Sequence, residues 1–254
     1  MRNYLDFSEK VVLVTGSTRN IGKAIAELFA EHGATVIINS RHSEDVERTV
    51  AEFRNHGYRA DGIAADVGDE TAVRAMVAEI VKRCGRIDTA VNNAASRPFD
   101  SKSFLADEET LHETLKTNVV GTFNVSRRVA EVMKEQKSGS IISISSSAAI
   151  DGSDITGLDY IMSKGAILSL TRGLAKELGS FGVRVNAVIP RYMLTERDWR
   201  LDDEMLKGAA ENTLLKRLGS PKEVASVCLF LASDMASFVT GEFIALGGTH
   251  KFYI

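Results

Sequence analysis

Short apolar runs alternate with segments of helical period along almost the whole chain, and this alternation is the strongest constraint on its fold. The run KVVLVTG at 10–16 is apolar and ends at a glycine, which is typical of a parallel strand buried on both faces. The next segment has apolar residues at spacings of three and four, namely Ile21, Ala24, Ile25, Leu28 and Phe29. This spacing indicates a helix that packs one face on a sheet.

The same alternation repeats to the end of the chain. Further strands are expected at 34–39, about 59–66, 89–92, 140–145, 183–188 and 242–246. Helices are expected at about 43–56, through Val73 and Cys84, in a long segment reaching about 135, at 158–179 and at 222–233. Strands that alternate with helices imply parallel crossovers. The predicted fold class is therefore α/β, a doubly wound, Rossmann-type parallel sheet with helices on both faces.

The chain has only three prolines in 254 residues, and no stretch is typical of an interdomain linker, a repeat or low complexity. We therefore expect a single domain over residues 1–254. One segment, 191–213, interrupts the alternation and carries many charges together with Trp199. Because it follows a strand end, we interpret it as a lid or substrate loop.

Composition excludes several classes of protein. The net charge of −3 leaves no basic excess for binding nucleic acid. No apolar run approaches the ~18 residues of a membrane span, and charges interrupt the N-terminal segment where a signal peptide needs apolar residues. Cys84 and Cys228 lack a CxxC partner and the histidines are scattered, so we expect reduced thiols and no metal site. These features predict a cytoplasmic protein.

A glycine-containing turn, Thr15-Gly-Ser-Thr-Arg-Asn-Ile-Gly22, lies between the first strand and the first helix. Gly16 permits a sharp turn, and Gly22 lets the helix approach the strand closely. The N–H groups at the start of the helix can receive a pyrophosphate. This context favours a dinucleotide site over a plain tight turn. Asn20 stands where a glycine is commonest, but asparagine tolerates a positive φ.

Two further motifs are weak when taken singly. Asn92-Asn93-Ala94-Ala95 follows the fourth strand, where open α/β sheets bind ligands, although asparagines are also ordinary turn formers. Tyr160 and Lys164 are four apart and share a helix face, which also describes many surface pairs. A nearby ammonium favours the phenolate form of a tyrosine, which suits acid/base chemistry.

The motifs gain weight from their order. From the N-terminus they are Thr15-Gly16 with Asn20 and Gly22, Asp66-Val67, Asn92 to Ala95, Asn118-Val119, the serines at 145–147, Tyr160 with Lys164, and Asn186 before Pro190. The C-terminal segment adds Arg217 to Ala225, Thr240-Gly241 and Gly247-Gly248. Over about residues 9–249 the sequence closely resembles the short-chain dehydrogenases/reductases, in particular their NADP-preferring, 3-oxoacyl reductase-like branch.

The resemblance implies catalytic roles for four residues. Tyr160 would be the acid/base, Lys164 would bind the nicotinamide ribose and favour the phenolate, and Asn118 would anchor a water that leads protons to the lysine. The serine that bonds the substrate oxygen is Ser146 by the local pattern Ile142 to Ala149, whereas the usual spacing of thirteen residues before the tyrosine selects Ser147. We favour Ser146, because a loop absorbs an extra residue more easily than a strand end shifts register.

The resemblance also implies the cofactor site. Asp66 would accept from the adenine amino group, unless it is the N-cap of the following helix. Val67 would lie near the adenine ring, Asn92 would hold neighbouring backbone, and Thr195 would contact the carboxamide. The full expected set is Gly16, Thr18, Arg19, Asn20, Ile21, Gly22, Ser40, Arg41, Asp66, Val67, Asn93, Ala94, Tyr160, Lys164, Pro190 and Thr195.

Charge at the end of the second strand predicts the choice of cofactor. Neutral Ser40 stands where NAD-binding relatives carry an acid, and Arg41 and Arg19 can both face a 2′-phosphate. We therefore expect NADP(H), with NAD(H) possible.

Two further positions depart from the usual pattern of the family. Arg191 follows Pro190 where glycine is usual, and Leu246 precedes the paired glycines where aspartate is common. Arg97, Arg191, Tyr192 and the unassigned Ser147 are candidate substrate residues. Either arginine could meet an acidic or phosphate-bearing substrate, or both could be solvated loop charges. The substrate itself cannot be named from the sequence.

The leading hypothesis is an NADPH-dependent reductase of ketones or aldehydes, or the reverse reaction. The alternatives are an NAD-dependent alcohol or polyol dehydrogenase and a non-catalytic, dinucleotide-binding regulatory protein. The resemblance implies a homotetramer through the helices after the fourth and fifth strands. Val119, Phe123, Val129 and Leu170 could serve that surface or pack on the sheet.

Overall fold

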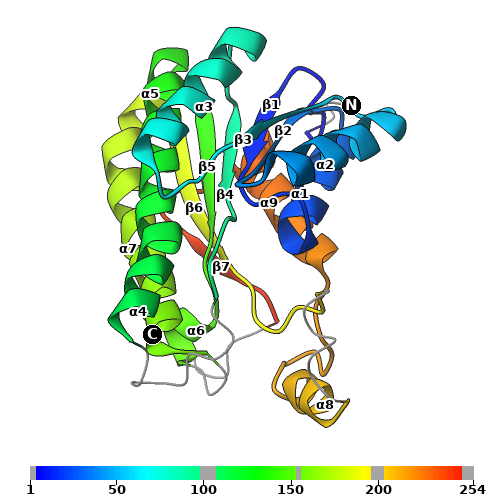
Figure 1. Cartoon of the computed structure of the whole chain (residues 1–254), viewed down its shortest axis with the longest axis vertical. Helices are drawn as coiled ribbons and strands as arrows, with labels where there is room; N and C mark the ends of the chain where they lie inside the picture. Colours follow the sequence, from blue (N-terminus) through cyan, green and yellow to red (C-terminus); the bar gives the residue numbers. More distant parts are fainter. Residues whose placement is uncertain (1–3, 98–106, 153–155, 196–202, 248–254) are drawn as a thin grey trace.

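One seven-stranded parallel sheet forms the centre of the molecule (Figure 1). The structure is a computed structural model that describes residues 4–97, 107–152, 156–195 and 203–247. The strands are β1 (Val11–Val14), β2 (Thr35–Ser40), β3 (Ala60–Ala64), β4 (Thr89–Asn92), β5 (Gly139–Ile144), β6 (Val183–Ile189) and β7 (Phe243–Ala245). Their order is β3-β2-β1-β4-β5-β6-β7, so the direction of winding reverses between β1 and β4.

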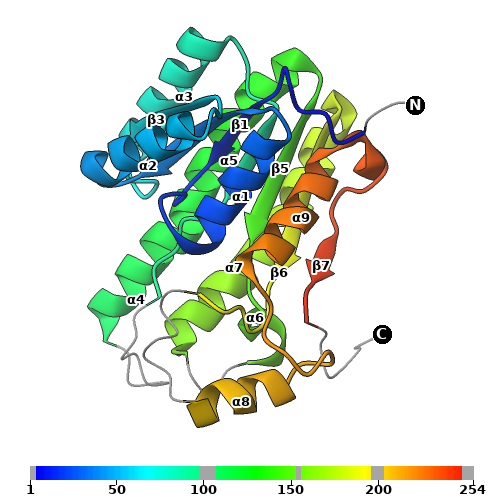
Figure 2. The ribbon, with the colours of Figure 1, turned by 90° about the vertical axis from the view of Figure 1, so that its right-hand side faces the viewer.

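Helices cover both faces of the sheet (Figures 1 and 2). One layer contains α1 (Asn20–Glu31), α2 (Ser43–Asn55) and α9 (Pro221–Ala232), and the other contains α3 (Glu70–Cys84), α5 (Gly121–Gln136) and α7 (Leu158–Leu178). Alternate strand residues enter the two cores: Val12 and Val14 pack with the first layer, and Val11 and Leu13 with the second. The predicted α/β, doubly wound fold is confirmed.

Three helical features lie at or near the carboxyl ends of the strands (Figure 2). The helix predicted to reach about 135 consists of α4 (Glu108–Leu115), a π-helical turn at Lys116–Val120, and α5. The sequence did not predict α6 (Ala148–Asp151) or α8 (Asp203–Glu211). Helix α8 falls inside the segment 191–213 interpreted as a lid; residues 196–202, with Trp199, lie outside the described residues. No helix in the described ranges is long and apolar enough to cross a membrane.

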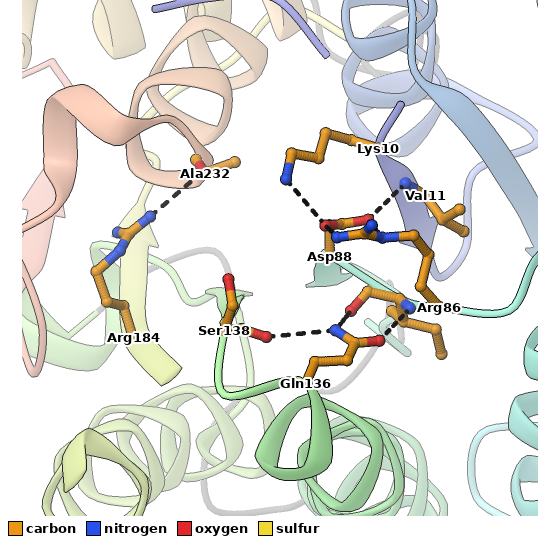
Figure 3. A network of polar contacts seen from close by, with 9 residues as sticks. Lys10, Val11, Arg86, Asp88, Gln136, Ser138, Arg184 and Ala232 are labelled. Atoms are coloured by element: carbon orange, nitrogen blue, oxygen red, sulfur yellow. Dashed lines mark hydrogen bonds and ion pairs between the residues drawn. The ribbon is translucent and has the colours of Figure 1, made fainter. Parts of the chain in front are cut away.

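Groups of polar contacts lie at the amino ends of the strands, opposite the carboxyl-end loops (Figure 3). Asp88 is 8% exposed and accepts bonds from Lys10 Nζ, from the Val11 N–H and twice from the Arg86 guanidinium. Arg184 donates to carbonyls at the end of α9, including that of Ala232. A cation is stabilised at the C-terminal end of a helix, so the bonds of Arg184 hold the end of α9 against β6.

The turn between β1 and α1 leaves no room for a side chain at Gly16 or at Gly22. Gly16 has φ +62° and Asn20 has φ +50°, as expected for an asparagine that replaces a glycine. A Cβ atom on Gly22 would lie 2.3 Å from the Gly16 carbonyl oxygen and 2.4 Å from Asn93 Nδ2. Glycine at position 22 therefore permits the contact between α1 and the two strand ends.

We predict that Gly22→Ala lowers the free energy of unfolding by about 1–3 kcal/mol, because the new methyl group meets backbone and a packed amide. Gly173→Ala is the matched control: Gly173 lies inside α7 with nothing within 4 Å of its added Cβ. It should raise stability by about 0.5–1 kcal/mol through helix propensity. Urea unfolding of both variants measures the difference, and equal midpoints would contradict the close-contact argument.

Candidate active site

A pocket of about 240 Å³ lies at the carboxyl ends of the central strands. It collects predicted residues from α1, from the ends of β4, β5 and β6, and from α7: Ile21, Asn93, Arg97, Ser146, Ser147, Tyr160, Lys164, Pro190, Arg191, Tyr192 and Thr195. Leu206 and Ala209 of α8 also line it, so the helix that the sequence did not predict forms one wall. The other predicted residues lie outside its lining, in the β1–α1 turn and the first turn of α1, at the end of β2, after β3, at Ala94 after β4, and in the π-helical turn.

Thr15 and Asn93 join the turn after β1 to the loop after β4. Thr15 Oγ1 accepts from the N–H groups of Asn93 (3.0 Å) and Ala94 (3.1 Å). Asn93 Nδ2 donates to the carbonyls of Thr15 and Gly16, each at 3.0 Å. Thr15 stood in the glycine motif, but sequence reasoning assigned it no role. These four bonds fix the backbone at the point where the sheet reverses its winding.

The N-cap side chain of α1 makes no capping bond. Arg19 occupies the N-cap position with extended backbone and no side-chain capping bond, and the first turn holds no acidic residue. Because Gly16 and Gly22 have no Cβ atom, no side chain covers the backbone at these two positions. A helix start of this kind is suited to an anion such as a pyrophosphate.

The ends of β2 and β3 are tied by Asn39, which sequence reasoning treated only as a strand residue. Its side chain is 1% exposed and donates to the carbonyls of Ile63 (3.0 Å) and Ala65 (3.2 Å). Ser40 is half-buried and Arg41 is exposed directly after it. No sequence signal marks a polar residue in a buried strand as a tie between two strand ends.

Asp66 and Val67 follow β3 near the same edge. Asp66 Oδ1 accepts from the Gly68 N–H at 2.9 Å, while Asp69 accepts from the N–H groups of Thr71 and Ala72 as the N-cap of α3. The alternative that Asp66 caps this helix is therefore wrong, because α3 begins at Glu70. Buried Val67 packs so closely on Gly121 that a Cβ there would lie 2.6 Å from Val67 Cγ2.

Asn118 is fully buried in the π-helical turn. Its amide accepts from the Ser96 N–H (2.7 Å) and donates to the Ser96 carbonyl (2.9 Å) and to Ser163 Oγ (2.9 Å). Ser163 Oγ in turn donates to the Tyr160 carbonyl at 2.7 Å. The amide thus links the loop after β4 to α7, and the expected role in a water relay stays a prediction.

Lys164 reaches from α7 to β5 beneath Tyr160. Its side chain is 2% exposed, and Nζ donates to the Ile144 carbonyl (2.8 Å) and lies 5.5 Å from the centroid of the Tyr160 ring. Burial lowers the pKa of Lys164 to about 8, because the charged form loses its hydration. The ammonium is therefore present at neutral pH but titrates far earlier than a solvated lysine.

The three consecutive serines have different partners. Ser145 Oγ donates to the Lys164 carbonyl at 2.8 Å and is buried, so it ties β5 to α7. Ser146 Oγ accepts from the Ala148 N–H at 3.2 Å, and the Ser147 N–H donates to the Pro190 carbonyl at 3.0 Å. Ser146 and Ser147 both line the pocket, so the choice between them stays open.

Arg191 is 10% exposed, and its Nη1 lies 2.5 Å from Asp151 Oδ2. The alternative that both loop arginines are solvated is therefore wrong for Arg191, because its side chain is largely covered and paired with Asp151. No sequence signal pointed to Asp151, which precedes it by 40 residues. Arg97 lies differently, with its guanidinium carbon 6.0 Å from the centroid of the Tyr160 ring.

The chain is similar in sequence to a known family of enzymes. The family described as enoyl-(acyl carrier protein) reductase matches residues 16–250. A 3-oxoacyl-[acyl-carrier-protein] reductase of Thermotoga maritima is 37% identical over 239 residues, which cover 94% of this chain and 96% of the relative.

Two solved structures are similar over the whole fold. A gluconate 5-dehydrogenase of Burkholderia cenocepacia in complex with NADP and tartrate superposes with a TM-score of 0.91 at 31% identity, covering 96% of both chains. A 3-oxoacyl-[acyl-carrier protein] reductase of Brucella melitensis with bound NAD has a TM-score of 0.88 at 35% identity, covering 99% of this chain and 97% of that one. The chain thus belongs to the short-chain dehydrogenases/reductases, in their 3-oxoacyl reductase-like branch, and is an oxidoreductase.

Proposed function

We propose that this enzyme transfers a hydride between NADP(H) and a small carbonyl or alcohol compound, with Tyr160 as the acid/base. The observation that carries the proposal is the position of Lys164 Nζ, which lies over the Tyr160 ring at 5.5 Å from its centroid. Both residues line the pocket at the end of the sheet. A buried cation beside a phenol stabilises the phenolate that forms when the proton leaves.

The residues at the β1–α1 turn fit a dinucleotide. The uncapped start of α1 and the two glycines would receive the pyrophosphate, with Thr18, Arg19, Asn20 and Ile21 around it. Asp66 and Val67 would contact the adenine, Asn93 and Ala94 would lie along the cofactor, and Pro190 and Thr195 would border the carboxamide. The bound cofactor supplies the hydride.

The chain's own residues hold the substrate oxygen and move its proton. Tyr160 donates a proton to the oxygen during carbonyl reduction, and Ser146 or Ser147 donates a second hydrogen bond. Lys164, held by the Ile144 carbonyl, binds the ribose hydroxyls and stabilises the phenolate. Asn118 holds the Ser96 loop and, through Ser163, the backbone of Tyr160.

The preference for NADP(H) rests on charge at the end of β2. Arg19 and Arg41 are exposed, Ser40 is neutral, and neither guanidinium makes an ion pair within the described part of the chain. Two uncompensated guanidinium groups favour a 2′-phosphate over a hydroxyl. NAD-dependent oxidation of an alcohol is the alternative, since solved relatives hold NADP or NAD.

We also propose that the enzyme assembles as a homotetramer through α4, α5 and α7. Val129 is fully buried in the core of its own chain and cannot serve a subunit surface. Phe123, however, is 43% exposed on α5, and Met162 is 55% exposed on α7. Exposed apolar side chains on neighbouring helices are typical of a surface covered by another subunit.

Tyr160→Phe should lower kcat for ketone reduction by about 10²–10⁴-fold, because the phenol that donates the proton is lost. Nucleotide affinity should stay within a few-fold of the wild type, since the ring and Lys164 remain. Steady-state oxidation of NADPH and nucleotide titration measure the two effects. Turnover that survives the substitution would overturn Tyr160 as the acid/base.

Arg41→Ala should raise KM for NADPH by about tenfold or more, because a charge-assisted bond to the 2′-phosphate is lost, and leave KM for NADH unchanged. Arg48→Ala is the control, since Arg48 is 70% exposed and pairs with Asp45 on the same helix. Equal use of the two nucleotides by the wild type, with no change in the variant, would refute the preference for NADP(H).

The free energy of unfolding should rise with pH between about 8 and about 10.5 through Lys164. In this window the unfolded chain keeps the proton while the folded chain, with the pKa of Lys164 lowered to about 8, has released it. The gain is roughly 3 kcal/mol. Urea unfolding of the wild type and of Lys164→Met at several pH values measures this gain as the difference between the two curves of unfolding free energy against pH. A wild-type curve parallel to that of the variant would contradict the lowered pKa.

A further inference from the structure

Four charged side chains line the described part of the pocket, and three of them have partners that the structure describes. Arg191 and Asp151 form an ion pair at 2.5 Å, which is neutral as a unit. Lys164 is buried against the Ile144 carbonyl and the Tyr160 ring. The fourth, Arg97, is partly buried and makes no ion pair with any acidic residue in the described ranges. Arg97 therefore adds to the pocket a positive charge that no acidic residue of the described ranges neutralises.

Arg97 lies next to the reacting centre. Its guanidinium carbon is 6.0 Å from the centroid of the Tyr160 ring, within the range of a cation–π contact. The hydroxyl of that ring is the group that meets the substrate oxygen in the proposed function. A substituent a few bonds from the reacting carbonyl can therefore reach the guanidinium.

Resting on the proposed function, we infer that Arg97 is a specificity residue that binds an anionic group of the substrate, a carboxylate or a phosphate. The planar guanidinium can donate two parallel bonds to either group. The pocket of about 240 Å³ also borders Pro190 and Thr195, assigned above to the cofactor, so the space left for the substrate suits a small molecule. The substrate class is a small oxo acid or oxo phosphate, or the corresponding hydroxy compound.

Arg191 is not the anion-binding residue, although it also lines the pocket. Its Nη1 is paired with Asp151, and because the Arg191 side chain is only 10% exposed, loss of that partner would leave a poorly hydrated charge uncompensated. Arg191 and Asp151 instead position the loop after β6 against α6, next to Tyr192. Changes at Arg191 should affect neutral and anionic substrates alike.

Matched substrate pairs test the inference. Wild-type enzyme is assayed with oxo acids and their methyl esters, and with dihydroxyacetone and its phosphate, which separates carboxylate from phosphate binding. We expect a higher kcat/KM for the anionic member of at least one pair. Arg97→Gln should raise KM for that anion by about 10–100-fold, with kcat and the neutral member little changed. Arg97→Lys should recover part of the loss, and Arg48→Gln serves as the surface control.

Two results would refute the inference while the proposed function stands: equal kcat/KM for the two members of every pair, or an Arg97→Gln enzyme that loses both members equally. If the wild type reduces no member of any pair, the proposed reaction is refuted for these compounds. Calorimetry with the NADP-saturated enzyme then decides the inference. Binding of the acid but not its ester, lost in Arg97→Gln, supports it, and absence of such binding refutes it.

Discussion

The amide of Asn93 occupies space that exists only because residue 22 is glycine. Asn93 Nδ2 donates to two carbonyls of the β1–α1 turn, and a Cβ on Gly22 would lie 2.4 Å from it. The turn and the loop after β4 are thereby fixed to each other at the point where the winding of the sheet reverses. Ligands of open α/β sheets bind at this point, so the rest of the site is built outward from the contact.

A chain of buried polar contacts extends from this point to the proposed acid/base. After Asn93 and Ala94 the loop reaches Ser96, whose N–H and carbonyl both bond to the Asn118 amide. Asn118 also donates to Ser163 Oγ, which donates to the Tyr160 carbonyl. Each bond contributes only about 1 kcal/mol net, but an unpaired buried partner costs about 1–3 kcal/mol. The contacts therefore fix one arrangement of the loops more than they add to overall stability.

The sequence predicted what depends on local pattern. Hydrophobic period located the seven strands and the long helices, because burial on one or two faces imposes it directly. Short helices such as α6 carry too few residues for a period to show. Position alone could not separate Asp66 from Asp69 as the cap of α3, since helix starts are uncertain by a few residues. The pairing of Arg191 with Asp151 depends on tertiary proximity over 40 residues, which a single sequence does not encode visibly.

The pocket contains three cationic side chains, Arg191, Lys164 and Arg97. They differ in how deeply they are buried and in what compensates for their lost hydration. Arg191 is 10% exposed and would lose its hydration uncompensated, so Asp151 neutralises it. Lys164 is more deeply buried with a carbonyl as its bonding partner, and the cost appears as a pKa lowered to about 8. Arg97 keeps part of its hydration and so tolerates the lack of a carboxylate among the described residues. The cations proposed for catalysis, Lys164, and for substrate selection, Arg97, thus differ in how much of their hydration they retain.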